Sequence, residues 1–395
     1  MNTTIQEIEL KVSRIHKALE KDGLQNVLLR SVPNILYLTG SVFQGYLLVD
    51  RSHPLPLIFL ERITDVLEGY PSELIYTARK PELIPEIISE KGISLSASTA
   101  LELGFLPVLE YQRLRQLATE GQVSSIDASA MMRNVRSIKT PQELTDIRRE
   151  IEVHMEIYRL VPQLFQMGMT DLELQHLIEY QMRRRGSIGV FRTFGPRMEA
   201  FMGHLLVGKN ADVPAPYDFA LGGRGSYAMP MGASGQEIIP GTTVMVDMAG
   251  NFGTFVTDIS RTYYLGELPN NVLKAHQLSV ELTEWFENNI KDGSPVSNVY
   301  NHFVKRAEEE GLANHFMGYT NKVKFVGHGF GIEINEPPVL TGRSKETFRE
   351  GMTIAVEPKF VFPEIGAVGI ENSYIINRDS VENLSPLPTD LISLV

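Results

Sequence analysis

Two strand-like segments of this 395-residue chain each carry a pair of acidic residues whose spacing could hold metal ions. Asp247 and Asp258 are eleven positions apart, around a Gly-Asn-Phe-Gly sequence at 250–253. In a hairpin that turns at 252–253 they would face each other, with Cβ atoms roughly 4.5–5.5 Å apart. Such carboxylates repel each other unless a divalent cation, or a pair of metal ions roughly 3.5–4 Å apart, lies between them.

The second pair is Glu357 and Glu371, which end the apolar runs 353–357 and 367–371. A hairpin centred on residue 364 would place these two glutamates opposite each other. An acid that is buried, charged and unpaired costs several kcal/mol. Two hairpins that each oppose two acids therefore favour bound cations over coincidence.

His328 is the fifth candidate ligand, and the glycines on both sides of it let the backbone approach a bound group closely. One imidazole with four carboxylates suits manganese, iron, cobalt or zinc better than calcium or magnesium. Each of these residues by itself is more simply interpreted as a surface or loop residue. The five together favour a dinuclear metal site.

The N-terminal third of the chain alternates a helix with short apolar runs. A helix is expected at 5–22, ended by Gly23, and apolar strands are expected at 27–29, 35–40, 46–49 and 55–59. This alternation predicts a small α/β domain, which we place at residues 1–132.

The rest of the chain, 133–395, is expected to form a second domain that carries all five candidate ligands. Thr140 and Thr170 each begin a T-x-x-E sequence, which predicts two capped helices. Further helices are expected at 269–291 and 295–310, and strands from 242 and over 323–378. Residues 192–241, rich in Gly and Pro, are expected to form a loop that faces the substrate.

Composition narrows the class of protein. The formal net charge of −11 argues against a general nucleic-acid binder, and the absence of cysteine excludes a disulfide or a thiolate metal site. The first residues have no basic and apolar leader pattern, and no uncharged apolar run approaches the length of a membrane span. We therefore expect a cytoplasmic protein that binds neither nucleic acid nor membrane.

Several segments resemble one known family. They are GHGFGIEINEPP at 327–338, Glu357-Pro358, NILYLTG at 34–40 and RSIKTPQE at 136–143. These resemble the pita-bread metallopeptidases, which include prolidases, Xaa-Pro aminopeptidases and methionine aminopeptidases. The resemblance covers nearly the whole chain and implies a creatinase/prolidase-like α/β N-terminal domain before an α+β pita-bread catalytic domain.

The resemblance also implies a mechanism. Asp247, Asp258, His328, Glu357 and Glu371 would bind two divalent ions (Mn, Co, Zn or Fe), which activate a water for peptide hydrolysis. Glu357 would act as general base and then donate to the leaving amine. The implied substrates are short peptides with proline in or near the cleaved bond, and the family often forms homodimers.

This chain departs from the family at its usual active-site histidines. Asn335 and Lys324 stand at two of these positions, the segment 227–232 lacks the third, and Gly369 replaces an arginine. Losing a group that stabilises developing charge can cost on the order of 10²–10³ in rate. The alternative function is therefore a metal-stabilised binding protein that has lost or altered peptidase chemistry.

Four residues in the segment 192–235 could replace the missing groups. His204 is a candidate catalytic residue if its loop folds back to the metal site; the competing interpretation is a structural histidine at the start of a strand. Arg192, Arg197 and Arg224 are candidates for binding a substrate carboxylate, because a guanidinium pairs with it in a bidentate manner.

Overall fold

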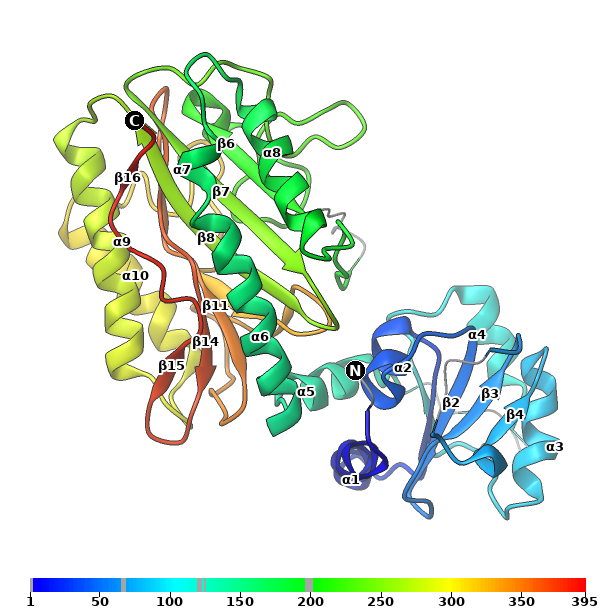
Figure 1. The fold of residues 1–395 in the computed structure, drawn as a ribbon. Coiled ribbons are helices and arrows are strands. Elements are labelled where there is room, and N and C mark those ends of the chain that lie inside the picture. The colour runs from blue at the N-terminus through cyan, green and yellow to red at the C-terminus, as the bar shows by residue number, and fades with distance from the viewer. Residues whose placement is uncertain (1–2, 65–68, 119–122, 124–125, 196–201) are drawn as a thin grey trace. The chain divides into compact units, whose positions relative to one another are not determined.

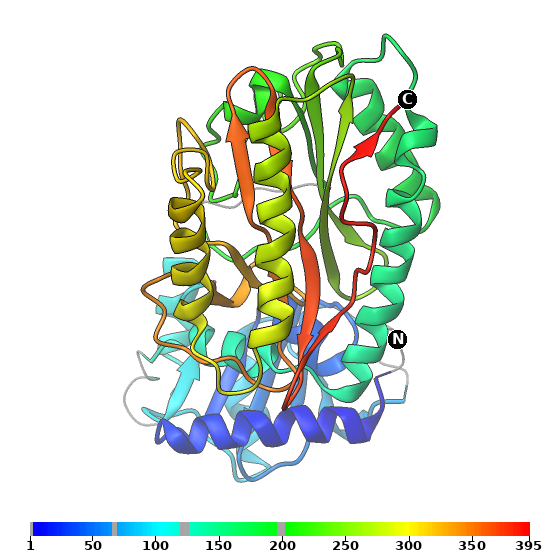
Figure 2. The ribbon, with the colours of Figure 1, turned by 90° about the vertical axis from the view of Figure 1, so that its left-hand side faces the viewer.

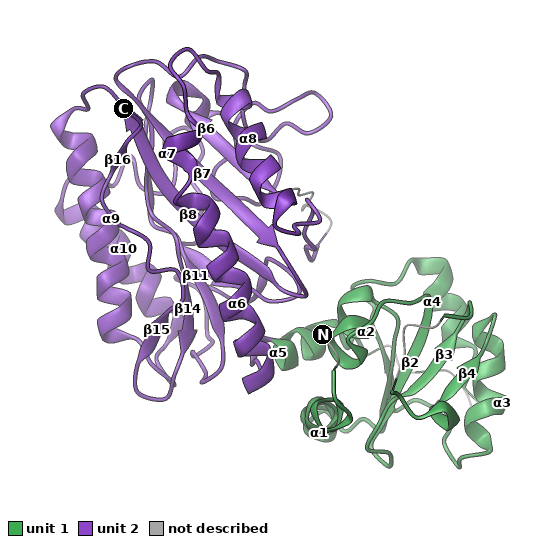
Figure 3. Cartoon of the chain, viewed as in Figure 1, with its two compact units in different colours: residues 1–136 green, residues 137–395 purple. Residues whose placement is uncertain are grey.

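The chain divides into two compact units, residues 1–136 and 137–395 (Figure 3). The computed structural model describes residues 3–64, 69–118, 123, 126–195 and 202–395. Within these ranges, no helix combines the length and the apolar character that a membrane crossing requires.

The first unit is built on a mixed five-stranded sheet in the order β4-β3-β2-β1-β5. Its apolar core includes Leu28, Leu48 and Phe59 from three neighbouring strands. The elements of this unit and the helix that leads out of it are α1 (Ile5–Lys21), β1 (Asn26–Leu29), α2 (Val32–Thr39), β2 (Gly45–Asp50), β3 (Leu57–Leu60), β4 (Ile75–Thr77), α3 (Ile84–Ser89), β5 (Thr99–Leu101), α4 (Val108–Arg115) and α5 (Ser129–Ser137), with 3-10 turns at Ser72–Leu74 and Pro81–Leu83.

The strand predicted at 35–40 is wrong, because this segment belongs to helix α2. Pro33 lies in the first turn of the helix, where its missing N–H costs nothing, and Gly40 ends it in the left-handed conformation with φ 68°. A short apolar run is equally compatible with a buried strand and a buried helix, so periodicity alone could not decide.

The second unit contains a four-stranded sheet, β16-β8-β7-β6, a five-stranded sheet, β10-β9-β11-β14-β15, and the ribbon β12-β13. Helix α6 packs on β8, and α9 packs on β12 and β13 (Figures 1 and 2). The elements of this unit are α6 (Pro141–Tyr158), α7 (Val161–Leu164), α8 (Asp171–Arg184), β6 (Gly203–Val207), β7 (Thr242–Asn251), β8 (Val256–Leu265), α9 (Asn270–Asn289), α10 (Val296–Glu309), β9 (Gly327–Gly329), β10 (Glu336–Val339), β11 (Thr353–Val356), β12 (Lys359–Phe362), β13 (Gly366–Gly369), β14 (Asn372–Ile376), β15 (Val381–Asn383) and β16 (Ile392–Ser393), with a 3-10 turn at Gly208–Asp212.

Local sequence explains where the first helices of this unit begin. Thr140 and Thr170 are N-caps, and each forms the predicted capping box with the glutamate three residues later. These boxes satisfy backbone N–H groups that a helix start would otherwise leave without partners. The helices α9 and α10 also fall within the predicted ranges.

Candidate metal centre

The first acidic pair lies on the β7–β8 hairpin, but its two aspartates are not directly opposed. Asp247 pairs with Ser260, and Asp258 pairs with Ala249. The predicted register is wrong because Asn251 already pairs with residue 256, so the connecting loop has four residues, 252–255, rather than two. A shift of two residues keeps every side chain on its face, so both aspartates still project from the same side of the hairpin.

Helix α6 holds this hairpin through three polar side chains spaced one turn apart. Glu150 accepts two backbone N–H groups of the hairpin loop, at 3.0 and 3.1 Å, and His154 Nδ1 lies 3.0 Å from Thr257 Oγ1. Tyr158 Oη accepts the N–H of Met248 at 3.2 Å. Burial raises the pKa of Glu150 to about 7 and lowers that of His154 to about 3. The residues beside both aspartates are therefore anchored to the helix.

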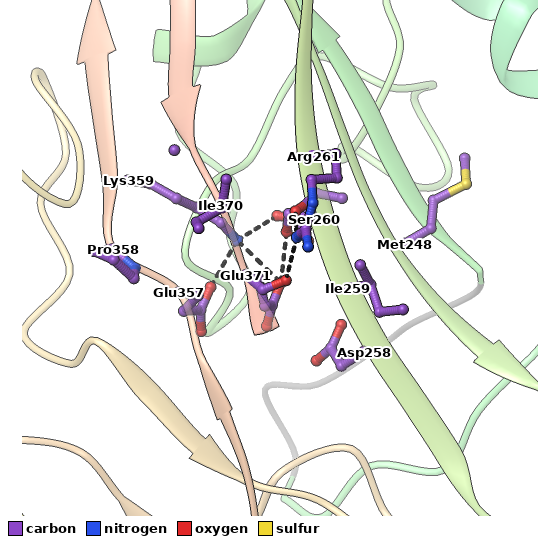
Figure 4. A network of polar contacts seen from close by, with 12 residues as sticks. Met248, Asp258, Ile259, Ser260, Arg261, Glu357, Pro358, Lys359, Ile370 and Glu371 are labelled. Atoms are coloured by element: carbon purple, nitrogen blue, oxygen red, sulfur yellow. Dashed lines mark hydrogen bonds and ion pairs between the residues drawn. The ribbon is translucent and has the colours of Figure 1, made fainter. Parts of the chain in front are cut away.

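The second acidic pair lies where a long ribbon is interrupted. Strands β11 and β12 pair with β14 and β13 in one continuous register, and Glu364, with φ 68°, lies at the turn. This confirms the predicted hairpin centred on residue 364. Glu357 and Glu371 occupy the two short gaps between the strand pairs, where their side chains face the β7–β8 hairpin (Figure 4).

All five predicted ligands come together at this point. His328 Nε2 lies 3.5 Å from Asp258 Oδ2 and 3.7 Å from Glu357 Oε1. Asp258, His328 and Glu371 offer ligand atoms that all lie within 4.8 Å of one another. Two carboxylates and an imidazole at this spacing fit a divalent transition-metal ion.

Ser260 connects Asp247 to the rest of the cluster. Its hydroxyl lies 2.8 Å from Asp247 Oδ1 and 2.5 Å from Glu371 Oε2, and it is fully buried. The hydroxyl therefore fixes the spacing between an acid of the hairpin and an acid of the broken ribbon.

Sequence reasoning missed Lys359, the cation at the centre of this cluster. Its Nζ lies 2.7 Å from Asp247 Oδ2. Figure 4 shows it beside the two glutamates, where it lies 2.7 Å from Glu357 Oε2 and 3.6 Å from Glu371 Oε2. The side chain is 1% exposed. Burial opposes its charge, but the three carboxylates outweigh burial and hold the pKa of Lys359 well above its usual value.

A signal for Lys359 was present in the sequence. Residues two apart on a strand point to the same face. The spacing in Glu357-Pro358-Lys359 therefore predicts that the lysine and the glutamate lie on the same side of the strand. An apolar strand with an acid and a base at this spacing indicates an internal ion pair.

The acids of the cluster differ in their charge state. Burial raises the pKa of Asp258 well above its usual value, with the nearby acids adding to the effect, and raises that of Glu371 to about 7. Burial acts on Asp247 too, but the ammonium of Lys359 and the contact with His204 hold its pKa well below the usual range. Asp247 is therefore the acid that stays ionised, whereas Asp258 and Glu371 resist ionisation unless a cation compensates their charge.

His204 lies beside Asp247. Strand β6 pairs with β7 so that the two residues are direct partners, and His204 Nε2 lies 3.4 Å from Asp247 Oδ2. The imidazole is 4% exposed and lines the cavity above the acids, and neither ring nitrogen has a hydrogen bond of good geometry within the described residues. His204 thus lies near the start of a strand, as the structural interpretation expected, and it also lies beside the acids, as the catalytic interpretation requires.

The cavity above the cluster has a volume of about 400 Å³ and largely apolar walls. Its floor carries His204, His328 and the four acids, and its walls include Phe191, Phe194, Phe219, Phe325 and Met231. Among the described residues that line it, none is an arginine or a lysine. Its chemistry therefore favours uncharged or cationic groups over a free carboxylate.

Two of the three predicted carboxylate-binding arginines, Arg192 and Arg224, do not line this cavity. Arg192 pairs through its backbone with Glu333, Arg224 is exposed on the segment after residue 221, and Arg197 lies outside the described residues. An arginine could not replace Gly369, because a Cβ there would lie 2.4 Å from the carbonyl oxygen of Pro358.

Asn335 supports the cavity wall at a position where the family has a histidine. Its Oδ1 accepts the N–H of Phe194 at 2.8 Å, and its Nδ2 donates to the carbonyl of Phe194 at 2.7 Å. This pair of bonds positions an aromatic side chain over the site. The other replaced position, Lys324, is exposed and lies outside the cavity lining.

Comparison with known families assigns both parts of the chain. Residues 145–378 match Metallopeptidase family M24, and residues 11–138 match the Creatinase/Prolidase N-terminal domain.

Relatives and solved structures match over nearly full length. The Xaa-Pro dipeptidase of Pyrococcus horikoshii is 24% identical over 97% of this chain and 98% of its own length. The structure of an Xaa-Pro dipeptidase from Bacillus anthracis gives a TM-score of 0.79 at 21% identity, covering 98% and 99% of the two chains. The X-Pro aminopeptidase of Thermotoga maritima gives 0.75 at 19%, covering 97% and 99%. These likenesses show a shared two-domain fold.

Proposed function

Because this chain belongs to Metallopeptidase family M24, we propose that it hydrolyses short peptides with a divalent ion held by Asp258, His328 and Glu371. The observation that carries the proposal is the convergence of four buried or nearly buried acids and one imidazole on the floor of an apolar cavity. Relatives named as Xaa-Pro dipeptidases support peptides with proline near the cleaved bond as the substrate class.

A bound divalent ion would supply a water of lowered pKa and polarise the scissile carbonyl. Glu357 is placed to handle the proton of that water. Its Oε1 faces His328 and the triad at 3.7 Å, while its Oε2 is held by Lys359 at 2.7 Å. Burial raises the pKa of Glu357, which suits a group that accepts a proton and returns it to the leaving amine.

The cavity favours binding the peptide through its amino end. A dipeptide presents its free carboxylate close to the cleaved bond, and the described lining offers that carboxylate no guanidinium or ammonium. A free α-ammonium, in contrast, would meet the acids of the floor and Asp218 of the wall. We therefore propose the aminopeptidase mode over the dipeptidase mode.

The test is a substrate panel with metal added. Xaa-Pro dipeptides and Xaa-Pro-Xaa tripeptides, each with a free or amidated C-terminus, are assayed with Mn²⁺, Co²⁺ or Zn²⁺. We expect metal-dependent release of the first residue, with amidation tolerated, and a loss of about 10²–10⁴ in kcat for Glu357→Gln. Turnover that is unchanged by chelator and by Glu357→Gln would overturn the proposal. The absence of turnover on every peptide of the panel would overturn it too.

Lys359 also supports a second candidate function, a binding protein that keeps the fold without hydrolysis. Its ammonium neutralises part of the acidic cluster, so the cluster is held together in part without a metal. Binding of the same peptides without cleavage, measured by calorimetry, would favour this alternative.

We further propose a cytoplasmic homodimer. The absence of cysteine is compatible with a reducing compartment, and the dimer is an expectation from the family resemblance. Manganese, cobalt, zinc and iron are the proposed ions because the site combines imidazole with carboxylates.

A further inference from the structure

The ammonium of Lys359 lies where a cation would bind Asp247 and Glu357. It contacts one oxygen of each at 2.7 Å and lies 3.6 Å from Glu371 Oε2. We propose that Lys359 replaces one of the two metal ions implied by the family resemblance, so that this site binds a single divalent ion, at Asp258, His328 and Glu371.

Space is the first reason. A metal ion binds carboxylate oxygens at about 2.0–2.2 Å. An ion on Asp247 Oδ2 and Glu357 Oε2 would therefore overlap the Nζ atom that already touches both oxygens. The ammonium and a second ion compete for one position, and the ammonium is covalently attached.

The two oxygens of Glu357 support a division into two cation positions. Oε2 faces the ammonium, while Oε1 faces His328 at 3.7 Å, on the side of the Asp258–His328–Glu371 triad. Glu357 thus lies between a position filled by the protein's own cation and a position whose three ligand atoms are within 4.8 Å of one another.

Backbone contacts hold Lys359 in its position beside the acids. Its carbonyl accepts the N–H of Met317 at 2.8 Å, and it pairs with Gly369 across the β12–β13 ribbon. At Gly369 a Cβ would lie only 3.0 Å from Lys359 Cα, so the ribbon is tightly packed there. With 1% of its surface exposed, the lysine side chain is buried, and its ammonium contacts the carboxylates of Asp247 and Glu357.

Counting ions tests this inference. The purified full chain is stripped with chelator, loaded with Mn²⁺ and desalted, and bound manganese is measured by elemental analysis and electron paramagnetic resonance. We expect one Mn²⁺ per chain with the spectrum of an isolated ion. Two ions per chain with an exchange-coupled spectrum, or no bound ion at all, would overturn the inference.

Three variants sharpen the test. Lys359→Gly vacates the position, and we expect it to bind two ions per chain with a coupled spectrum. Lys359→Met keeps the bulk without the charge, and we expect it to stay at one ion. Lys324→Gly is the exposed control and is expected to match the parent chain. If folded Lys359→Gly still binds one ion, the lysine is not what excludes the second ion. Two ions in Lys359→Met would support the inference and assign the exclusion to the charge of the ammonium instead of its bulk.

The inference rests on the proposed metal site and not on peptide hydrolysis. A chain that binds one Mn²⁺ but cleaves no peptide would leave the inference standing and remove the proposed function. A chain that cleaves peptides with two bound ions would do the reverse.

Discussion

His204 and Lys359 show what a single residue adds to an inherited ligand set. Lys359 brings a fixed charge to Asp247, with Nζ at 2.7 Å from Oδ2, and His204 brings an imidazole to the same oxygen, with Nε2 at 3.4 Å. Within the described residues, neither ring nitrogen of His204 makes a well-formed hydrogen bond, so we expect this cavity-lining imidazole to donate one to a substrate carbonyl oxygen as negative charge develops there.

We expect His204→Ala to lower kcat by about 10²–10³ while KM changes little, because the lost contact forms mainly in the transition state. Steady-state kinetics on the best peptide of the panel measures this split. His176→Ala, on the exposed side of α8, is the matched control and should leave both constants unchanged. A rise in KM at unchanged kcat would mean that His204 only helps to bind the substrate.

At the residue scale the sequence identified the five side chains that the fold brings together, but not the groups that surround them. Acids and a histidine in apolar or glycine-bounded segments are recognisable because burial there is costly without a partner. Lys359 was missed because lysine is not a metal ligand, and its role depends on three carboxylates from other strands. The segment 192–241 was expected to face the substrate, and Phe194, Phe219 and Met231 of this segment line the cavity, but the sequence did not specify which of its side chains would do so.

At the scale of elements, α6 contacts the β7–β8 hairpin through a polar seam, which is formed by Glu150, His154 and Tyr158 of the helix. His154 lies in this seam with no exposed surface, and its ring is 3.0 Å from Thr257 Oγ1, one residue from Asp258. The hairpin register was mispredicted because a Gly-rich turn sequence is compatible with two-residue and four-residue loops alike. The contacts of this seam hold the hairpin in the register with the four-residue loop.

His154 gives the free energy of unfolding a pH dependence of defined sign, opposite to that of Glu150, whose raised pKa favours the folded chain as the pH falls. Burial lowers the pKa of His154 from 6.5 to about 3 in the folded chain. As the pH falls, the histidine of the unfolded chain takes up a proton before that of the folded chain does. The contribution of His154 to the free energy of unfolding is therefore complete above pH 6.5 and is lost as the pH falls from 6.5 toward 3. Between pH 7 and pH 4 the loss is on the order of 3 kcal/mol.

His154→Asn should remove this dependence while keeping an acceptor for Thr257. We expect the variant to be less stable than the parent chain at pH 7 because of the cavity it leaves, with the gap narrowing by roughly 3 kcal/mol toward pH 4. Urea unfolding in chelator across this range measures the gap. His176→Asn is the exposed control and should show none. A gap that is constant with pH would mean that His154 titrates normally.

At the scale of the whole molecule, the chain has two units with separate apolar cores. Leu28 and Phe59 belong to the core of residues 1–136, whereas Phe286, Phe303 and Tyr374 belong to a core of residues 137–395. All five candidate ligands and Lys359 lie in the second unit. The alternation of elements indicated an α/β N-terminal domain, but the three-sheet arrangement of the second unit depends on long-range pairings that local patterns do not encode.

This separation predicts that metal binding stabilises only the second unit. A ligand that binds only the folded state, at a free concentration of a hundred times its Kd, adds about 2.7 kcal/mol to the free energy of unfolding of the unit that binds it. We expect saturating Mn²⁺ to raise the unfolding midpoint of residues 137–395 and to slow amide hydrogen exchange in β7, β8 and β11, leaving residues 1–136 unchanged. Calorimetry and exchange mass spectrometry measure the two effects. His328→Ala should abolish both, because it removes one of the three ligands of the proposed ion. Equal protection of both units in the parent chain would show that the site is coupled to the first unit.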